Sequence, residues 1–216
     1  MARYVISDTH FGHANILLYE LSRLTQMQMA GHNDFDRFLV ESWNDRVGRS
    51  DRVLHLGDVA FGDGYRYAGK LAGDITLIVG NHDRPKYLEY YKSLGWDVVQ
   101  GVRIGLKGGE RVARQLRRIY GDRCDHPLLS AIVERVRERV VLFSHFPVFD
   151  DNPYDEKFAD IREMLEFVFV ECGCDLNVHG HIHSKQAKEP FCINASVERI
   201  GFEPLSLERL LLDSRL

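Results

Sequence analysis

The sequence predicts an α/β protein, because short apolar runs rich in β-branched residues alternate with segments whose apolar residues recur at helical spacing. Several of the apolar runs stop near a glycine and continue directly into Asp, Asn or His, as in residues 78–83 (Ile-Val-Gly-Asn-His-Asp). Side chains that follow a strand of an open α/β sheet lie in the crevice at its carboxyl end, where ligands bind. Five strand ends of this kind predict one shared polar site.

The first quarter of the chain predicts two strands and one helix. Residues 3–7 (Arg-Tyr-Val-Ile-Ser) form the first strand pattern, and residues 15–33 follow as a poorly defined connection. A helix is indicated by apolar residues at helical spacing, namely Phe35, Phe38, Leu39, Trp43 and Val47. Asp34 or Asn33 is its expected N-cap. Residues 52–56 read as the second strand, since Gly57 ends the apolar run.

The next segment continues the alternation. We expect a short helix at residues 65–72 and a buried strand at 75–79, which the glycine of the opening motif terminates. Pro85 suits the first turn of a helix that extends to Leu94, because its missing N–H is not needed there. Residues 97–99 and 102–104 predict two short strands.

Residues 105–138 form a basic segment for which we expect two helices. Val112, Leu116 and Ile119 indicate the first, and the apolar residues of 128–136 indicate the second. Residues 101–139 hold ten basic and five acidic residues. Three of the basic residues share one helical face and are candidate substrate contacts: Arg111, Arg114 and Arg118. This face is either solvated or a basic cap that receives an anionic substrate.

The last third predicts a strand at residues 139–144, a helix at 161–169 and a strand at 175–178. Residues 191–194 and 205–212 are expected to be closing strands. No repeat or linker interrupts the chain, so we expect a single domain over residues 1–216.

Composition restricts the class of protein. The chain has 216 residues with 44% hydrophobic and 28% charged content, which is ordinary for a globular protein. It has no run of 18 apolar residues and no signal-peptide pattern, and its four cysteines do not suggest a disulfide framework. We therefore expect a cytoplasmic protein with reduced thiols. The net charge of -4 excludes a wholly basic nucleic-acid binder.

Candidate metal ligands gather at the strand ends. They are Asp8, His10, Asp58, Asn81, His145, His181 and His183. Asp8 and His10 are two residues apart, and in an extended chain they would project to the same side. Mixed oxygen and nitrogen donors suit Mn, Fe, Zn or Ni better than Mg or Ca. Seven donors exceed one tetrahedral site and fit two cations that share a bridging carboxylate.

The ordered motifs Asp-x-His, Gly-Asp, Gly-Asn-His-Asp, Ser-His and Gly-His-x-His resemble those of the calcineurin-like metallophosphoesterase superfamily. The opening residues 7–13 (Ser-Asp-Thr-His-Phe-Gly-His) further resemble its small bacterial and phage phosphoesterases. The resemblance implies a four-layer αββα sandwich of two mixed β-sheets. It implies one metal subsite made by Asp8, His10, Asp58 and His183. The second subsite would be made by Asp58, Asn81, His145 and His181, with Asp58 bridging.

Two divalent ions, manganese first among the candidates, can clamp the attacking and leaving oxygens at phosphorus and keep a bridging hydroxide deprotonated. The expected reaction is hydrolysis of a phosphomonoester or phosphodiester. His82 is the candidate catalytic residue, placed to protonate the leaving group or to stabilise charge on phosphorus. Phe61 stands where protein phosphatases of the superfamily have an Asp, which argues against a protein-phosphatase activity.

The remaining polar residues near these motifs have two readings each. His13 and Asn15 either contact the substrate or fix their loop. His55 is expected to be packed or hydrogen-bonded inside its strand, and His179 to support the ligands or pack.

Three functions remain open. The leading one is a phosphoesterase, and the basic segment favours nucleotides or nucleic-acid ends as its substrates. A nuclease would grip nucleic acid through the basic segment. A non-catalytic scaffold of the same fold would be expected to lose ligands, and none is lost here. The oligomeric state is not predicted.

Overall fold

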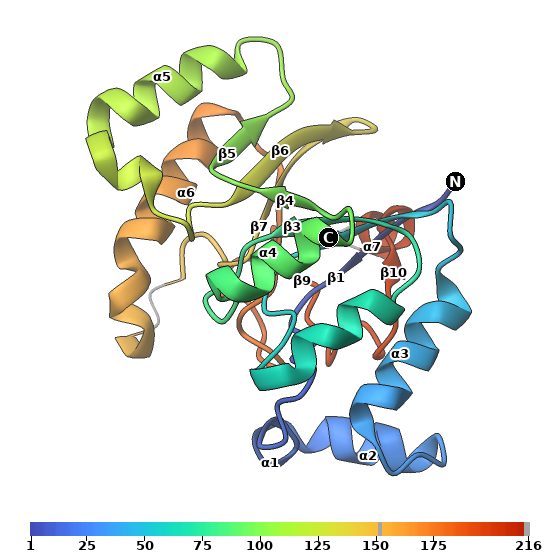
Figure 1. The fold of residues 1–216 in the computed structure, drawn as a ribbon. Helices are drawn as coiled ribbons and strands as arrows, with labels where there is room; N and C mark the ends of the chain where they lie inside the picture. Colours follow the sequence, from blue (N-terminus) through green and yellow to red (C-terminus); the bar gives the residue numbers. More distant parts are fainter. Residues whose placement is uncertain (151–152, 214–216) are drawn as a thin grey trace.

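The computed structural model describes residues 1–150 and 153–213 and contains two five-stranded sheets packed face to face (Figure 1). The strands are β1 (Arg3–Ile6), β2 (Arg52–His55), β3 (Asp74–Ile78), β4 (Asp97–Val99), β5 (Val102–Ile104), β6 (Ala131–Val136), β7 (Arg139–Ser144), β8 (Leu176–His179), β9 (Cys192–Asn194) and β10 (Leu205–Ser206). The first sheet has the order β10-β1-β2-β3-β4 and the second β5-β6-β7-β8-β9.

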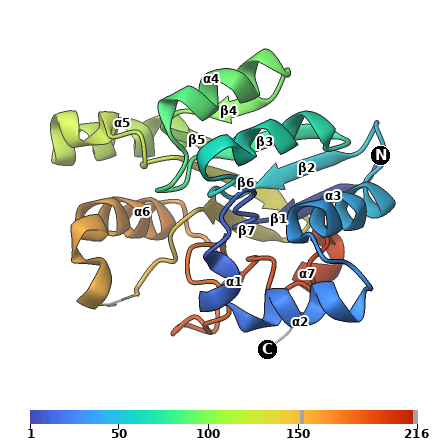
Figure 2. The same cartoon turned by 60° about the horizontal axis from the view of Figure 1, so that its bottom comes forward.

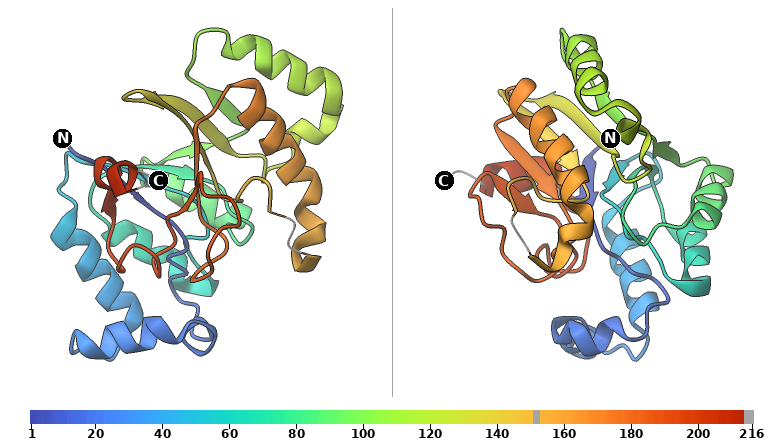
Figure 3. Two further views of the ribbon diagram at one scale, coloured as in Figure 1. Left: turned by 180° about the vertical axis from the view of Figure 1, so that it is seen from behind. Right: turned by 90° about the vertical axis from the view of Figure 1, so that its left-hand side faces the viewer.

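Helices surround the two sheets. They are α1 (Ile16–Tyr19), α2 (Leu21–Met29), α3 (Phe35–Arg46), α4 (Pro85–Ser93), α5 (Gly109–Tyr120), α6 (Ala159–Glu171) and α7 (Leu207–Asp213). Residues of α2, α3 and α4 pack outside the first sheet and residues of α5 and α6 outside the second, whereas Leu207 and Leu210 of α7 pack into the cluster between the sheets. Short 3₁₀ segments lie at η1 (Gly62–Lys70), η2 (Gly121–Asp125) and η3 (Pro153–Phe158). The right-hand view of Figure 3 shows α6, in orange, on one outer side and α4, in green, on the other.

Three apolar clusters account for the layers. Between the sheets, Leu56 and Ile78 of the first pack with Phe143 and Val178 of the second, and all four are fully buried. Outside the first sheet a cluster includes Trp43 of α3. Outside the second sheet another cluster includes residues of α5 and α6. The predicted four-layer αββα sandwich is confirmed.

The parallel strands bring distant motifs to one edge. β1, β2 and β3 are parallel neighbours, with Ile6 opposite His55 and His55 opposite Leu77. β7 and β8 are parallel neighbours in the second sheet. Carboxyl ends of parallel neighbours lie at the same edge of a sheet. Figure 2 shows the chain leaving β1 at this edge and entering α1.

The helix starts follow the local sequence. The Asp34 side chain accepts a hydrogen bond from the Arg37 N–H at 3.1 Å, so Asp34 is the N-cap of α3. Pro85 occupies the first turn of α4 as expected.

Four element predictions are wrong. Residues 15–33, for which the sequence indicates only a poorly defined connection, contain α1 and α2, and η1 is a 3₁₀ helix that begins three residues before the expected helix. The helix expected at 128–136 is instead strand β6, paired with β7 from Ala131 opposite Ser144 to Val136 opposite Arg139. The strand expected at 205–212 gives two residues of β10 and then α7. Short apolar runs fit both periods, and tertiary pairing decides between them.

The basic segment is therefore only half helical. α5 carries Arg111, Arg114 and Arg118, whereas β6 is an internal strand of the second sheet. In Figures 1 and 3, α5 lies at the opposite end of the molecule from α1. Within the described residues, no helix has the length and apolarity to cross a bilayer.

Candidate metal centre

The candidate ligands lie in the loops that directly follow β1, β2, β3, β7 and β8. Five of the seven adopt a left-handed backbone, with φ of 59° at Asp8, 51° at His10, 58° at Asp58, 70° at His181 and 51° at His183. The expectation that Asp8 and His10 continue an extended chain is therefore wrong. Their side chains still approach each other, with His10 Nε2 at 3.7 Å from Asp8 Oδ1. Left-handed conformations are costly for residues other than glycine and cluster at functional sites.

Asp58 lies at the centre of the group. Its Oδ2 is 3.6 Å from His10 Nε2 and 3.6 Å from His145 Nε2, and its side chain is 2% exposed. His82 Nε2 approaches the same oxygen to 4.0 Å. The Asp58 carboxylate thus faces candidate ligands that follow strands of both sheets.

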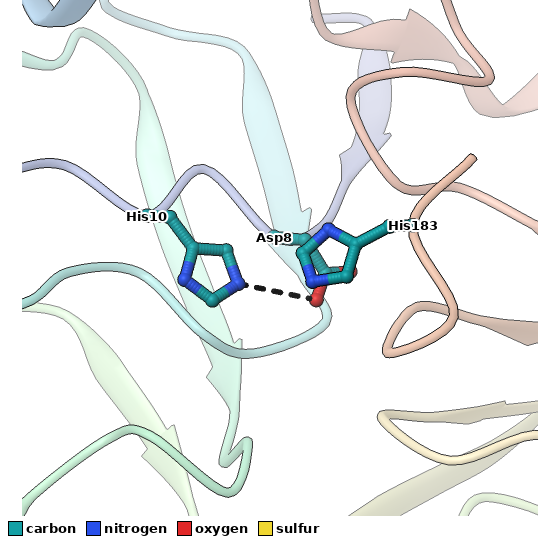
Figure 4. Close-up of side chains that lie close together, drawn as sticks. All are labelled: Asp8, His10 and His183. Carbon is teal, nitrogen blue, oxygen red and sulfur yellow. Dashed lines mark ion pairs between the residues drawn. The ribbon is translucent and has the colours of Figure 1, made fainter. Parts of the chain in front are cut away.

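Only one of the two carboxylate oxygens of Asp8 accepts hydrogen bonds from the described residues. Its Oδ2 accepts hydrogen bonds of 2.9 Å from the Ser196 hydroxyl and from the His181 N–H. Its Oδ1 is buried without a hydrogen-bond partner among the described residues, and so are both ring nitrogens of His10. Unpartnered buried polar atoms are costly, and a bound cation would satisfy the carboxylate oxygen and one imidazole nitrogen. Figure 4 shows the His10 and His183 rings beside the Asp8 carboxylate.

His145 and Asn81 also face each other as acceptors. The Leu56 carbonyl, 2.8 Å from His145 Nδ1, can only accept, so Nδ1 carries the proton and Nε2 presents a lone pair. The Asn81 Oδ1, another acceptor, lies 2.9 Å from this Nε2. A cation held by both atoms would relieve the repulsion between them.

The charges of the group favour a cation. Burial, followed by the Asp8 charge, raises the pKa of Asp58 to about 7. Burial also opposes ionisation of Asp8, but the close approach of His10, at 3.7 Å, and the charges of the other nearby histidines hold its pKa well below the usual value. Burial lowers the pKa of His10 to about 3, which leaves this imidazole neutral and able to coordinate. Among the candidate ligands, two sets of three have atoms within 4.8 Å of one another and could hold an ion: Asp8, His10 and His183, and Asp8, Asp58 and His145.

Asp83, the last residue of the Gly-Asn-His-Asp motif, fixes two of the loops. Its carboxylate accepts N–H groups of Asp58 at 2.9 Å, Val59 at 3.0 Å and Gly80 at 2.9 Å. The His82 N–H in turn donates to Asp58 Oδ1 at 2.8 Å. The loops after β2 and β3 are therefore held together before any ion binds.

His82 lies at the open side of the group, with 44% of its side chain exposed. Its ring is 4.6 Å from the ring of Phe61, which also stacks on His13 at 4.0 Å. Phe61 therefore lies beside His82 where protein phosphatases of the family are expected to place a carboxylate. Burial, followed by the His145 charge, lowers the pKa of His82 to about 4, so the ring is neutral.

Of the candidate substrate contacts, only some lie near the metal-ligand group. His13 joins the ring cluster beside His10, at 5.6 Å between ring centroids, and Asn15 is exposed just before α1. The α5 arginines do not join the group. Arg114 lies 3.8 Å from Glu110 of the same helix, and Arg111 and Arg118 are exposed.

The two other strand histidines are buried. His55 accepts the Gly57 N–H on Nδ1 at 3.2 Å and contacts the Thr9 hydroxyl through Nε2 at 3.1 Å, which confirms a hydrogen-bonded role. His179 is fully buried, with Nδ1 2.8 Å from the Gly180 carbonyl.

Sequence reasoning missed three residues behind the ligands: Arg23, Ser196 and Glu198. Arg23 is fully buried and donates to the carbonyls of Asp8 and Thr9 at 2.7 and 3.1 Å. The one sequence signal is its position four residues before buried Met27, on the inner face of α2. Ser196 and Glu198 follow the last histidine motif with no diagnostic spacing.

A family model described as calcineurin-like phosphoesterase matches residues 1–185, and the chain belongs to this family. It is accordingly a metal-dependent phosphoester hydrolase, and its substrate is a phosphoester. The group at the strand ends, including Asp8, Asp58 and His145, is its candidate metal site.

Two phage proteins are similar over most of the chain. The gene 66 protein of Mycobacterium phage D29 is 29% identical over 192 residues, which cover 83% of this chain and 77% of that protein. The gene 66 protein of Mycobacterium phage L5 is 27% identical over 188 residues, covering 82% and 75%. The crystal structure of the protein of unknown function AQ665 from Aquifex aeolicus shares the fold, with a TM-score of 0.67, 24% identity and 98% coverage of both chains.

Proposed function

We propose that the protein hydrolyses a phosphomonoester or phosphodiester with two divalent ions that share Asp58. The observation that carries the proposal is the position of Asp58 Oδ2, 3.6 Å from both His10 Nε2 and His145 Nε2. One subsite would comprise Asp8, His10, Asp58 and His183, and the other Asp58, Asn81, His145 and His181. The unpartnered atoms of Asp8 and His10 and the facing acceptors of Asn81 and His145 support these assignments.

When bound, two such ions supply a nucleophile at neutral pH and neutralise charge on the phosphate oxygens. Mixed nitrogen and oxygen donors make manganese the first metal to test, followed by iron, zinc and nickel. The chain's own contribution is to hold these donors in place and to present His82. From its exposed position 4.0 Å from Asp58, the His82 ring can donate one N–H to a phosphoryl or leaving oxygen.

The experiment combines metal analysis with a substrate panel. Purified protein should retain or take up two Mn²⁺ per chain, and p-nitrophenyl phosphate and its bis-ester should separate monoesterase from diesterase activity. No turnover with any of the four metals would contradict the enzymatic proposal and favour a scaffold.

His82→Ala should lower turnover by about 100-fold while Mn²⁺ content stays unchanged, because the ring contacts the reacting group and not the metal. His126→Ala is the matched control, since His126 is exposed in the loop after η2. Loss of Mn²⁺ from His82→Ala would instead make His82 a ligand.

The nuclease alternative depends on the basic face of α5. Because α5 lies at the far end of the molecule from α1, we expect that reversing its charges leaves phosphoester turnover and its salt dependence unchanged. The triple variant is Arg111→Glu, Arg114→Glu and Arg118→Glu. A selective loss of activity on DNA or RNA would restore the nuclease function.

A further inference from the structure

A buried ion pair lies directly behind the Asp8–His10 side of the metal centre. The Arg23 side chain, in α2, is 0% exposed, and the Glu198 side chain, between β9 and β10, is 1% exposed. Arg23 Nε donates to Glu198 Oε1 at 2.7 Å, and Nη2 lies 2.5 Å from the same oxygen. Buried charges in proteins are paired in this way because an isolated one is very costly.

The same carboxylate oxygen reaches a candidate ligand. His183 Nδ1 lies 3.2 Å from Glu198 Oε1. A carboxylate paired with a guanidinium accepts hydrogen bonds, so His183 carries its proton on Nδ1 and keeps the lone pair on Nε2. That is the tautomer a metal ligand needs, and a carboxylate behind a ligating histidine also fixes the orientation of the ring.

Arg23 extends this support to the first motif. Its remaining N–H groups donate to the backbone carbonyls of Asp8 and Thr9, at 2.7 and 3.1 Å. Asp8 has a left-handed φ of 59°, so the loop needs such contacts to hold its shape. One guanidinium therefore fixes both the Asp8 loop and the Glu198 carboxylate.

We propose that Glu198, anchored by Arg23, is a positioning residue that sets the tautomer and orientation of His183 and so controls the affinity of one metal subsite. This inference rests on the two-metal centre proposed above. It assigns a role to a residue beyond 185, where the family match ends. It also predicts that the two subsites respond differently, because Glu198 supports His183 and not Asn81 or His145.

A cation held by Glu198 itself is the competing explanation. Glu20, His183 and Glu198 could also hold an ion, and Glu198 Oε2 is buried without a hydrogen-bond partner in the described part of the chain. However, the Arg23 guanidinium already supplies a positive charge to Glu198 Oε1, and it would repel a metal ion at this distance. The geometry therefore favours positioning over a third metal site.

The test is a Mn²⁺ titration of metal-free protein, by calorimetry and by equilibrium dialysis with elemental analysis. Glu198→Gln keeps the side-chain shape but removes the charge. The control is Glu203→Gln, the same change in the same terminal segment, where the side chain is 40% exposed and pairs with Arg46 at 3.3 Å. We expect two Mn²⁺ sites in the wild type and in Glu203→Gln. In Glu198→Gln one site should weaken by about 10- to 100-fold while the other is unchanged.

Thermal unfolding of the metal-free proteins separates positioning from a purely structural role. A structural role alone would lower the melting temperature of Glu198→Gln and leave both Mn²⁺ affinities of the folded protein equal to those of the wild type. That result would overturn the inference. So would a wild type with three Mn²⁺ sites of which Glu198→Gln loses one, since this result would make Glu198 a ligand.

A second variant keeps the test decisive if Glu198→Gln does not fold. Arg23→Met with Glu198→Met removes both charges, which is tolerated far better than removing one partner. It should show the same selective weakening, and unchanged Mn²⁺ affinities in this folded variant would also overturn the inference. If the wild type binds no Mn²⁺ or other candidate metal, the proposed metal centre itself fails. If the wild type binds two and the folded variants match it, only the role of Glu198 fails.

Discussion

Gly80 brings the loop after β3 into close contact with the loop after β2, and an added methyl group there should displace Asp58. A Cβ at this position would lie 2.3 Å from Asp58 Oδ1 and 2.5 Å from the Asp58 N. The φ of Gly80 lies outside the left-handed region, so alanine can adopt the backbone conformation. The effect of Gly80→Ala must therefore come from the contact with Asp58.

The size of the effect follows from these distances. An ordinary contact begins at about 3.4 Å, so the Asp58 carboxylate must move by about 1 Å. Metal sites keep ligand distances within about 0.2 Å, so a shift of this size should lower Mn²⁺ affinity by about 100-fold or more, equivalent to about 2.7 kcal/mol. Overpacking should also lower the free energy of unfolding by about 1–3 kcal/mol.

Calorimetric Mn²⁺ titration and urea unfolding measure the two effects. The matched control is Gly105→Ala, where the nearest atom to an added Cβ, the Val133 carbonyl oxygen, lies at an ordinary 3.4 Å. The control should bind Mn²⁺ like the wild type. A Gly80→Ala protein with wild-type Mn²⁺ affinity would show that the position of Asp58 does not matter, and the bridging role would be wrong.

Two further predictions concern residues around the ligands. Burial lowers the pKa of His55 from 6.5 to about 3, so the neutral ring adds stability above pH 6.5 that is lost as the pH falls toward 3. Between pH 7 and pH 5 this one group should remove about 2 kcal/mol from the free energy of unfolding. Urea unfolding at the two pH values should therefore show about 2 kcal/mol less loss in His55→Gln, and an equal loss would contradict the assignment. Phe61→Ala should lower turnover by about 10- to 100-fold at unchanged Mn²⁺ content, because His82 loses the ring that holds it. Steady-state kinetics and elemental analysis check this result, and a loss of Mn²⁺ instead would place Phe61 behind the ligands.

The strand ends could be predicted because their signal is local. An apolar run that ends at Gly57 or Gly80 marks both a strand and the turn after it. Because parallel strands end at the same edge of a sheet, the residues that follow them are brought together there. The left-handed backbone at Asp8 and His10 gave no such signal, because aspartate and histidine adopt extended and left-handed conformations alike.

The sequence wrongly predicts a helix at strand β6 for a related reason. Its apolar residues fit a helical spacing, and the hairpin that joins it to β7 turns at Arg137 and Glu138 in place of the usual Asn-Gly or Asp-Gly. The hairpin is stabilised by pairing with β7 and burial of residues such as Val133, which depend on the rest of the fold.

Arg23 and Glu198 could not be predicted as partners. They are 175 residues apart, and each looks like an ordinary charged residue of a surface segment. Only the folding of the terminal segment against β1, where Ser196 bridges to Ser7, brings Glu198 under the first loop.

The left-handed residues of the ligand loops imply a particular balance between folding and metal uptake. At about 1–2 kcal/mol each, five such residues oppose folding by about 5–10 kcal/mol, comparable to the entire net stability of a domain. The hydrogen bonds of Arg23, Asp83 and Ser196 must offset this cost in the metal-free protein. An arriving ion would then meet donors that are already aimed, so little of its binding free energy would be consumed in ordering the chain. Glycine at these positions would remove the strained conformation together with the donor atoms and the hydrogen bonds of Asp8 and Asp58, so the strain is tied to the residues that would hold the ion.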